Sequence, residues 1–420
     1  MATVRWEGKS EAVAQVETGA ITAYDAASTY TITIGGVEVS VPGDTDVNTT
    51  AANLVAAAGA STHPYFSTIS WTNPSGASVV GTAATPGVPF DASLTVTGGT
   101  GTVTNFSETT ASKGPYHWDD ADNWAGGSLP GASDDVVIEN SSSNILYGLS
   151  TITAALASIV VPKTFTGRIG LDAASFSTGG TATDSDAAEY RDTYLEVDVA
   201  SIELGQQTGP GSPAGSPRIK ISNTKAGASV LTVYDTNSSS SESFLPAVRY
   251  LADNAAADVN VIEAPGGVGI GMDYDGETAT VGDVVLKSTS TSDRLFIGSG
   301  VTWTNYTQYG GSAVIDGAAD VTSINAWSGD LEINGDFGCT TLTNNGCEIV
   351  DNHVKTAGNA VTTINNNSGS LDLDRSTNER TIATLNQGDS ATLILDPNVV
   401  TVTSYNNPST RFTASFEPVV

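Results

Sequence analysis

The last third of the chain contains an irregular repeat that constrains the fold more than any other feature. Each unit has a Ser or Thr, an aliphatic residue, an Asn or Thr, a polar turn, and then two alternating aliphatic residues. The units occupy residues 321–336, 339–352, 361–376 and 382–398. The aliphatic residues that mark them, 18, 22 and 21 positions apart, are Ile324, Leu342, Ile364 and Leu385. A period of about 20 residues without helical periodicity is typical of a β-solenoid.

Short strands with alternating apolar residues continue upstream through 141–320. We therefore expect one parallel β-helix, or β-solenoid, over 141–420, with loop insertions near 172–192 and at 205–217. With rungs roughly 4.8 Å apart, about a dozen of them form a rod on the order of 60 Å long. The asparagines of the repeat suit turns with left-handed backbone angles and also suit ladders from rung to rung. They are Asn344, Asn345, Asn365, Asn366 and Asn367.

Residues 1–112 have a different texture and are predicted to form a small α+β module. The segment 29–41 alternates apolar and polar residues on both sides of two glycines, which is a hairpin signal. A helix is expected after Asp46, because apolar residues recur there at helical spacing behind a good N-cap residue. Three further strand candidates lie at 66–72, 77–84 and 93–98, and 107–115 is predicted to be a linker.

The stretch 113–140 stands between the module and the solenoid and is predicted to be a linker and solenoid cap. It contains Trp118 and Trp124, which we expect to cover the open core of the first rung. Asp134 and Asp135 come just before an apolar strand, where their carboxylates are expected to fix the turn by local hydrogen bonds. A cap is needed because an open end rung invites aggregation.

Charge excludes several classes of partner. The chain has 420 residues, with 46 acidic against 16 basic side chains, so its net charge is −30. Binding to nucleic acid or to an anionic membrane requires clusters of Lys and Arg, so neither partner is expected. The amino-terminal sequence has no secretory signal pattern, and no apolar run is long enough to span a membrane. Synthesis in a cytoplasm is therefore expected.

No residue pattern predicts an active site or a cofactor. Acidic residues of the repeat (Asp330, Glu332, Asp336, Asp372, Asp374 and Glu379) are interpreted as outward-facing charge rather than as a carbohydrate-cleaving pair. Asp273, Asp275 and Glu277 match the start of a calcium loop, but the full loop and its helices are absent, which favours a solvated turn. Three scattered histidines do not predict a metal site. Cys339 and Cys347 are expected to be buried core residues.

Four aromatic residues fall within two adjacent repeat units: Trp303, Tyr306, Tyr309 and Trp327. Exposed aromatic rings of this kind stack on the faces of sugars, so these residues are candidate contacts for a host-surface glycan. Packing inside the solenoid or at a subunit seam explains such residues equally well.

The sequence resembles uncharacterised structural proteins of tailed bacteriophages. The resemblance is carried by the segments 116–149, 158–171 and 189–197, and by an amino-terminal W-x-G-K-x-x-A-V-A-Q-V pattern from Trp6 to Val16. The small module, with its hairpin at 29–41, is also similar to one common in such virion proteins. The resemblance covers nearly the whole chain, with the carboxy-terminal rungs more divergent, and it brings no catalytic residues.

The resemblance implies a virion component with an amino-terminal docking module and a projecting β-helix, in a layout that is typically trimeric. We expect a decoration, or cement, protein on the capsid exterior that binds the major capsid protein and stabilises the head shell without enzymatic activity. The alternative is a tail-associated receptor-binding fibre or tailspike, with or without polysaccharide depolymerase activity. A bacterial surface adhesin is a third class, which the missing secretory signal disfavours.

Overall fold

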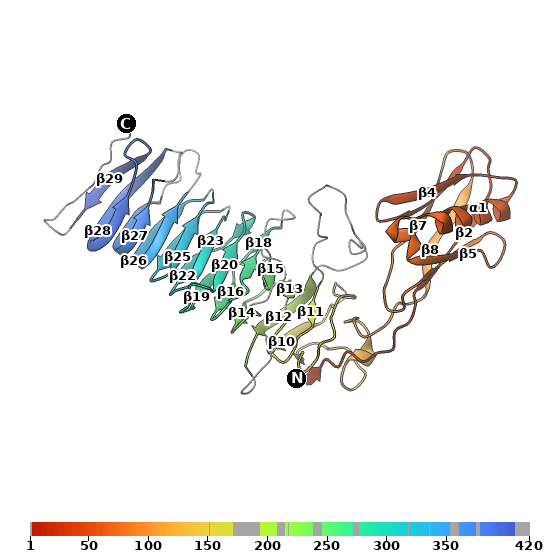
Figure 1. The fold of residues 1–420 in the computed structure, drawn as a ribbon, viewed down its shortest axis with the longest axis horizontal. Coiled ribbons are helices and arrows are strands. Elements are labelled where there is room, and N and C mark those ends of the chain that lie inside the picture. Colours follow the sequence, from red (N-terminus) through yellow and green to blue (C-terminus); the bar gives the residue numbers. More distant parts are fainter. Residues whose placement is uncertain are drawn as a thin grey trace.

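The structure is a computed structural model, and it describes residues 2–150, 152–170, 194–207, 215–216, 218–237, 246–271, 277–317, 319–335, 337–352, 361–374 and 379–407. Within these ranges the chain is mainly β, with a small amino-terminal module at one end of an elongated sheet of parallel strands (Figure 1). The expected insertion at 172–192 and most of the one at 205–217 lie outside the described residues.

The amino-terminal module has two antiparallel sheets and a helical layer. One sheet has the order β5-β6-β2-β8, and the other has the order β4-β3-β7. Their strands are β2 (Val16–Ala23), β3 (Thr29–Ile34), β4 (Val37–Pro42), β5 (Ile69–Thr72), β6 (Ser78–Ala83), β7 (Ser93–Thr97) and β8 (Thr102–Thr110). The helices are α1 (Val47–Ala60) and α2 (Pro64–Ser67). The module has its own apolar core, which includes Tyr30, Ile32, Leu54 and Phe66.

The local predictions for this module are largely confirmed. β3 and β4 form the expected hairpin, with Ile34 opposite Val37. The Asp46 carboxylate accepts a 2.8 Å hydrogen bond from the Thr49 backbone N–H and so caps α1. The predicted linker at 107–115 is partly wrong, because residues up to Thr110 belong to β8. This stretch pairs with β2, which the sequence did not suggest, so long-range pairing rather than local propensity makes it a strand.

Outside the module, most of the described strands form one large hydrogen-bonded system of parallel strands, called here the parallel sheet. Its strands are β1 (Thr3–Arg5), β9 (Asp135–Val137), β10 (Ala155–Val161), β11 (Arg168–Ile169), β12 (Leu195–Leu204), β13 (Arg218–Asn223), β14 (Ser229–Val233), β15 (Val248–Ala252), β16 (Ala257–Val261), β17 (Val268–Ile270), β19 (Asp283–Leu286), β20 (Arg294–Ile297), β22 (Asn305–Gln308), β23 (Ser312–Ile315), β24 (Val321–Ala326), β25 (Asp330–Ile333), β26 (Cys339–Asp351), β27 (Thr363–Asp372), β28 (Arg380–Ile394) and β29 (Val400–Asn406). A separate pair joins β18 (Ala279–Thr280) to β21 (Val301–Thr302), and a 3-10 turn, η1, covers Ala121–Asn123.

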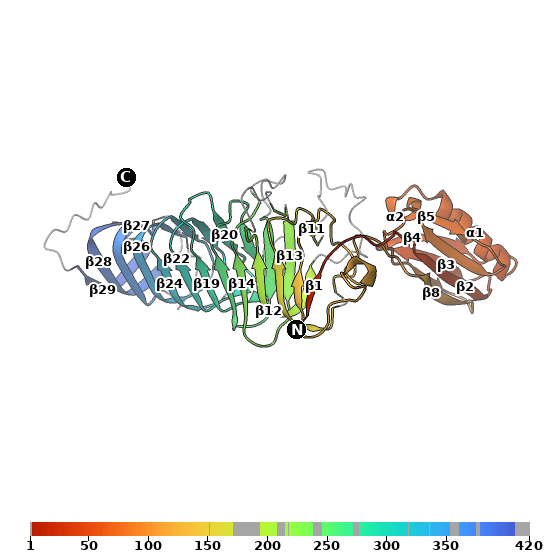
Figure 2. The same cartoon turned by 90° about the horizontal axis from the view of Figure 1, so that it is seen from below.

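The pairing sorts the strands of the parallel sheet into two stacks. The first stack runs β1-β9-β10-β12-β14-β16-β19-β22-β24-β26, and the second runs β11-β13-β15-β17-β20-β23-β25-β26. Between β13 and β25, each strand therefore pairs mainly with strands of its own stack rather than with the next strand in the chain. The long strands β26, β27 and β28 contribute to both stacks. Figure 2 shows the strands following one another along the long axis of the body.

The two stacks enclose a single apolar core that extends from Trp6 to Val400. Alternation along each strand creates it, because every second side chain points inward. The four aliphatic residues that mark the repeat are fully buried, and their register is continuous: Ile324 pairs with Leu342, Leu342 with Ile364, and Ile364 with Leu385. The repeat seen in the sequence therefore corresponds to the stacking of equivalent core positions.

The parallel sheet begins with residues from the start of the chain. β1 pairs in parallel with β9, so Thr3–Arg5 form the first strand of the sheet although they lie within the predicted module 1–112. The chain then leaves for the module and returns at the 113–140 stretch, where β9 resumes the sheet. No short-range pattern announces this pairing, because its partners are 132 positions apart in sequence.

An amide ladder lies inside the parallel sheet, within the long strands β26, β27 and β28. The Asn344 side chain donates to Asn366 Oδ1 over 3.1 Å, and Asn366 donates to Gln387 Oε1 over 3.0 Å. Asn344 and Asn366 are fully buried. The ladder expected from the sequence is thus present, but the left-handed angles predicted for these asparagines are wrong. The positive φ angles in this part of the sheet fall instead on Gly329, Gly346 and Gly369, where no Cβ interferes.

Asn366→Ala should lower the free energy of unfolding by about 1–3 kcal/mol, because it strands the buried Gln387 carbonyl and the Thr392 carbonyl that Asn366 serves. Asn367→Ala is the matched control: this neighbour is exposed, and its loss should change stability by no more than about 0.5 kcal/mol. Chemical denaturation followed by circular dichroism measures both values. Equal effects of the two substitutions would contradict a structural role for the internal ladder.

Candidate functional site

The outer surface of the first stack, from β22 to β29, carries an array of uncharged polar side chains, called here the neutral face. Strand register aligns these side chains in two columns along the long axis. One column is Asn305, Ser323, Thr341, Thr363, Thr384 and Ser404, and the other is Thr307, Asn325, Thr343, Asn365, Asn386 and Asn406. They point outward because the residues between them fill the core.

Hydrogen bonds within the neutral face hold its side chains in order. Ser323 Oγ donates to Asn305 Oδ1 over 2.8 Å. Farther along, Asn386 donates to Asn365 Oδ1 over 2.7 Å, and Asn406 donates to Asn386 Oδ1 over 2.9 Å. A primary amide has two N–H donors and a carbonyl with two lone pairs, so a ladder that uses one of each leaves hydrogen-bonding capacity for a ligand. The face is therefore both ordered and able to bind further polar groups.

The four aromatic residues predicted as glycan contacts divide into two groups. Trp303 and Tyr306 are only 2% and 0% exposed, so the prediction is wrong for them: they face inward and fill the core. Tyr309 and Trp327 are 52% and 51% exposed. Each directly follows a strand of the first stack, β22 and β24 respectively, at the rim of the neutral face. Position relative to the strand, not distance along the sequence, decides which group a residue joins.

The exposed rings of Tyr309 and Trp327 lie against each other. Their centroids are 6.4 Å apart, and the ring planes are within 14° of parallel. Backbone pairing places the two rings side by side, because Trp327 N–H donates to the carbonyl of Gln308, the residue before Tyr309. The same edge continues with amides: Asn367 donates to Asn345 Oδ1 over 2.9 Å. Two aromatic rings and two amides thus lie along one rim of the neutral face.

Most of the acidic residues of the repeat, which were weighed above as a carbohydrate-cleaving pair, lie on the second stack. Asp330 and Glu332 are exposed side chains of β25, and Asp330 is in register with Glu348 of β26. Asp372 ends β27, and Asp374 and Glu379 are exposed. Asp336 lies outside the described residues. The described acids therefore occupy a surface other than the neutral face, as outward-facing charge.

Three tryptophans pack together where the parallel sheet begins. Trp6, Trp118 and Trp124 are nearly fully buried, and the ring of Trp124 meets those of Trp6 and Trp118 edge to face at 5.1 and 4.6 Å. Trp124 Nε1–H donates to Trp118 O over 2.8 Å. All three belong to the same core as Val136 of β9. Trp6 was missing from the predicted cap, since nothing local connects it to residues more than a hundred positions away.

The two predicted cap aspartates make different contacts. The Asp134 carboxylate accepts hydrogen bonds from the Ala2 and Gly131 backbone N–H groups, at 3.0 and 2.9 Å, and these bonds lower its pKa. Asp134 therefore fixes both the turn and the start of the chain. Asp135 is the first residue of β9, where it accepts a 2.6 Å hydrogen bond from Ser158 Oγ of β10.

A group of charged residues is buried on the outer side of β13 and β15. Arg249 is 1% exposed and donates to Glu277 Oε1 over 2.5 Å, and Tyr194 OH donates to the same oxygen over 2.7 Å. The Tyr194 ring lies 5.6 Å from the Arg249 guanidinium carbon and 6.0 Å from Lys220 Nζ. Glu277 thus has a cationic partner, Arg249, and the other two residues of the calcium-loop pattern, Asp273 and Asp275, lie outside the described residues. The sequence signal for this buried group was the alternation of Arg218 and Lys220 with isoleucines, which places both basic side chains on one side of a strand.

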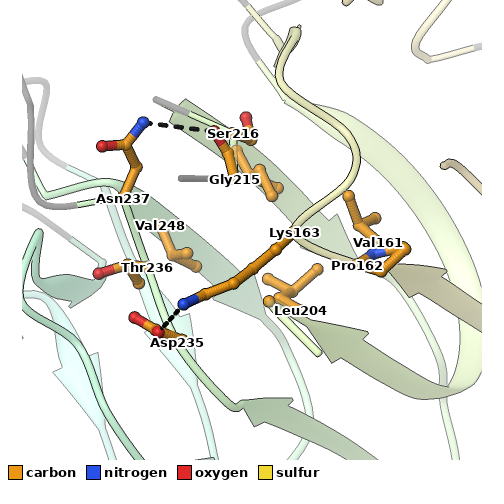
Figure 3. A pocket seen from close by; sticks show the side chains of 12 residues that line it. Val161, Pro162, Lys163, Leu204, Gly215, Ser216, Asp235, Thr236, Asn237 and Val248 are labelled. Atoms are coloured by element: carbon orange, nitrogen blue, oxygen red, sulfur yellow. Dashed lines mark hydrogen bonds and ion pairs between the residues drawn. The ribbon is translucent and has the colours of Figure 1, made fainter. Parts of the chain in front are cut away.

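A small pocket lies beside the ends of β10 and β12 (Figure 3). Lys163 and Asp235 form an ion pair across it, and Asn237 donates to Gly215 O over 3.3 Å. The cavity volume is about 10 Å³, which suits about one water molecule. The pocket is therefore a small gap between neighbouring segments of the parallel sheet, and it is too small for an organic ligand.

Within the described residues, no three His, Cys, Asp or Glu side chains are grouped to hold a metal ion. His117 packs on Tyr147 and contacts Gly87 O through Nε2 at 3.1 Å, while His353 lies outside the described residues. Cys339 and Cys347 are buried and unpaired in β26, as predicted. Burial raises the pKa of each thiol to about 12, so the reactive thiolate is scarce at neutral pH.

One acidic group of the amino-terminal module is buried. Glu17 of β2 is 7% exposed, and its Oε1 accepts a 2.9 Å hydrogen bond from Gln15 Nε2. Burial is the main cause that raises the Glu17 pKa to about 7, and the nearby charges of Asp91 and Glu108 add to the effect. This carboxyl therefore changes charge near neutral pH.

Comparisons with known proteins do not assign this chain to a family. No protein-family model matches the sequence, and no curated protein matches it. In the part of the chain that the structure describes, no helix is both long and apolar enough to cross a membrane.

Trp124→Ala should lower the free energy of unfolding by about 3–5 kcal/mol, because it leaves a cavity at the start of the core between Trp6 and Trp118. Leu129→Ala is the control, since Leu129 lies in the same stretch but is 46% exposed. Thermal and chemical unfolding measure both. A Trp124 variant as stable as the Leu129 variant would show that this end of the core needs no cover.

The module should be less stable at neutral than at acid pH because of Glu17. Its folded pKa of about 7 lies above the ordinary value of 4.5, so its contribution is complete below pH 4.5 and is lost as the pH rises through 7. Glu17→Gln should match the wild type at pH 4.5 and exceed its melting temperature above pH 7. Calorimetry at several pH values measures the difference. A constant gap between the two proteins across this range would contradict the assignment.

Proposed function

We propose that the parallel sheet is a β-solenoid whose two stacks are its principal faces. The support is the pairing pattern, in which the strands between β13 and β25 bond mainly to strands of the same stack. The continuous column of marker aliphatic residues supports it further, because each rung repeats the core position of the last. An isolated rung cannot bury its apolar face, so stacking is what stabilises such a fold.

We further propose that the chain is a structural component of a tailed-phage virion, and specifically a decoration protein of the capsid. One observation carries this proposal: a compact α+β module is attached to the end of an elongated sheet through a strand, β1, and a tryptophan cluster. That construction suits a docking module that holds a projecting arm. The resemblance of the segment from Trp6 to Val16 to phage structural proteins supports a place in the virion, and the major capsid protein is the partner proposed for the module.

Charge fits a role on a crowded particle surface. A net charge of −30 makes neighbouring copies repel each other outside their specific contacts and keeps the particle soluble. Many modest contacts, repeated over a shell, stabilise it through multivalency without any chemistry. A trimer is part of the proposal, since three copies bring three docking modules to one site and shield part of each solenoid.

A second role is favoured by one specific observation, the exposed pair Tyr309 and Trp327. Paired aromatic rings on a projecting arm suit a receptor-binding protein of the tail. The two roles differ in copy number and in place on the particle.

Quantitative mass spectrometry of purified virions tests the choice. A decoration protein should be present in a fixed, high ratio to the major capsid protein, and labelled antibodies should mark the head in electron micrographs. Removal of residues 16–110, which span β2 to β8 and leave β1 and Trp6 in place, should abolish binding to heads. A low copy number with labelling at the tail would contradict decoration, and absence from the virion would contradict both roles.

A further inference from the structure

The neutral face is unusual in this protein because it has no charge. From β22 to β29 its two columns contain only Asn, Ser and Thr, although the chain has 46 acidic side chains. Charge resumes one rung earlier, where Asp283 Oδ1 accepts a hydrogen bond from Asn305. The corresponding columns of the second stack include Asp330, Glu332 and Glu348. The difference between the two stacks identifies a surface suited to an uncharged partner.

The side chains of the neutral face have the chemistry that recognises sugars. Hydroxyl and amide groups donate to and accept from the hydroxyls of a sugar ring, and the ladder holds them in place before a ligand arrives. Tyr309 and Trp327 offer aromatic faces on which the C–H side of a pyranose ring packs. Both kinds of contact occur together on one rim, with Asn345 and Asn367 continuing the line of the rings.

The spacing of the face suits a ligand that repeats. Strand register places equivalent polar groups about 4.8 Å apart along the long axis. That step is comparable to the length of one pyranose ring, so successive sugars of a chain meet successive rungs in a similar way. A repeating surface of this kind binds a polymer through many equivalent contacts.

We propose that the neutral face and the Tyr309–Trp327 pair bind an uncharged polysaccharide that lies along the axis of the parallel sheet. Acidic polysaccharides are disfavoured, because a protein of net charge −30 repels them. A second copy of the chain is a poorer occupant, since the columns present polar groups rather than the apolar centre of a stable interface. The proposal is independent of attachment to a head or a tail, so it can fail without affecting the virion role.

Tryptophan fluorescence gives a direct readout of this site. Of the six tryptophans, Trp327 is 51% exposed, while the other five are at most 9% exposed. Acrylamide should therefore quench mainly Trp327, and a sugar packed on its ring should protect it. The probes are dextran, laminarin and galactomannan as neutral polysaccharides, with alginate and polygalacturonate as acidic ones, and native affinity electrophoresis on the same full-length chain measures retardation.

We expect at least one neutral polysaccharide to retard the wild type and to protect its fluorescence, and neither acidic one to do so. Trp327→Ala and Tyr309→Ala should each weaken binding about tenfold or more, as truncation of a central aromatic contact does. Trp327→Phe should retain most of the affinity, because it keeps a ring. Tyr24→Ala is the control, since Tyr24 is 36% exposed in the amino-terminal module and should bind as the wild type does.

Three results would overturn the proposal. The first is no retardation and no protection by any of the neutral polysaccharides. The second is binding that Trp327→Ala and Tyr309→Ala leave unchanged, or binding of the acidic polysaccharides instead. The third is a change of oligomeric state in these variants without an effect on polysaccharide binding, measured by light scattering, which would assign the face to contacts between copies. Circular dichroism should be unchanged in every variant, because the substituted side chains are exposed.

Discussion

Parallel backbone hydrogen bonding between successive strands of each stack is the constraint on which the rest of the structure depends. It places like positions above one another, so a single position in the repeat becomes a column in space. The column of Ile324, Leu342 and Ile364 becomes core, and the column of Asn344 and Asn366 becomes a buried amide ladder. On the outside, the same register turns Asn, Ser and Thr into the neutral face. Core, internal ladder and candidate site are three consequences of one pairing.

The first strands of the parallel sheet leave one end of its core open, and long-range contacts cover that end. β1 supplies an extra strand next to β9, and Trp6 joins Trp118 and Trp124 across the start of the core. Because the same segment leads directly into the amino-terminal module, the cover of the core is also the attachment of the module. Stability of this end and the position of the module are thereby coupled.

Sequence reasoning succeeded where the signal was periodic or local. It predicted the helix capped by Asp46, the hairpin at 29–41 and the stacking of the marker aliphatic residues. It failed where pairing was distant, as for β1, and where a residue's position in the rung mattered, as for Trp303 against Tyr309. The neutral face was not recognised either. Each Asn, Ser or Thr taken singly carries no signal. Only strand register shows that these residues align into columns without charged side chains.

The strand register of the neutral face can be tested directly. Asn325 and Thr343 are paired neighbours on adjacent strands of the neutral face, whereas Asn325 and Thr341 are offset by one column. Cysteines at 325 and 343 should form a disulfide under mild oxidation, because paired strand positions lie within the Cα separation of about 4.4–6.8 Å that the bond requires. Cysteines at 325 and 341 should not. The native thiols of Cys339 and Cys347 are buried and should stay unreacted. Equal cross-linking of both pairs, or preference for the offset pair, would contradict the stacked columns.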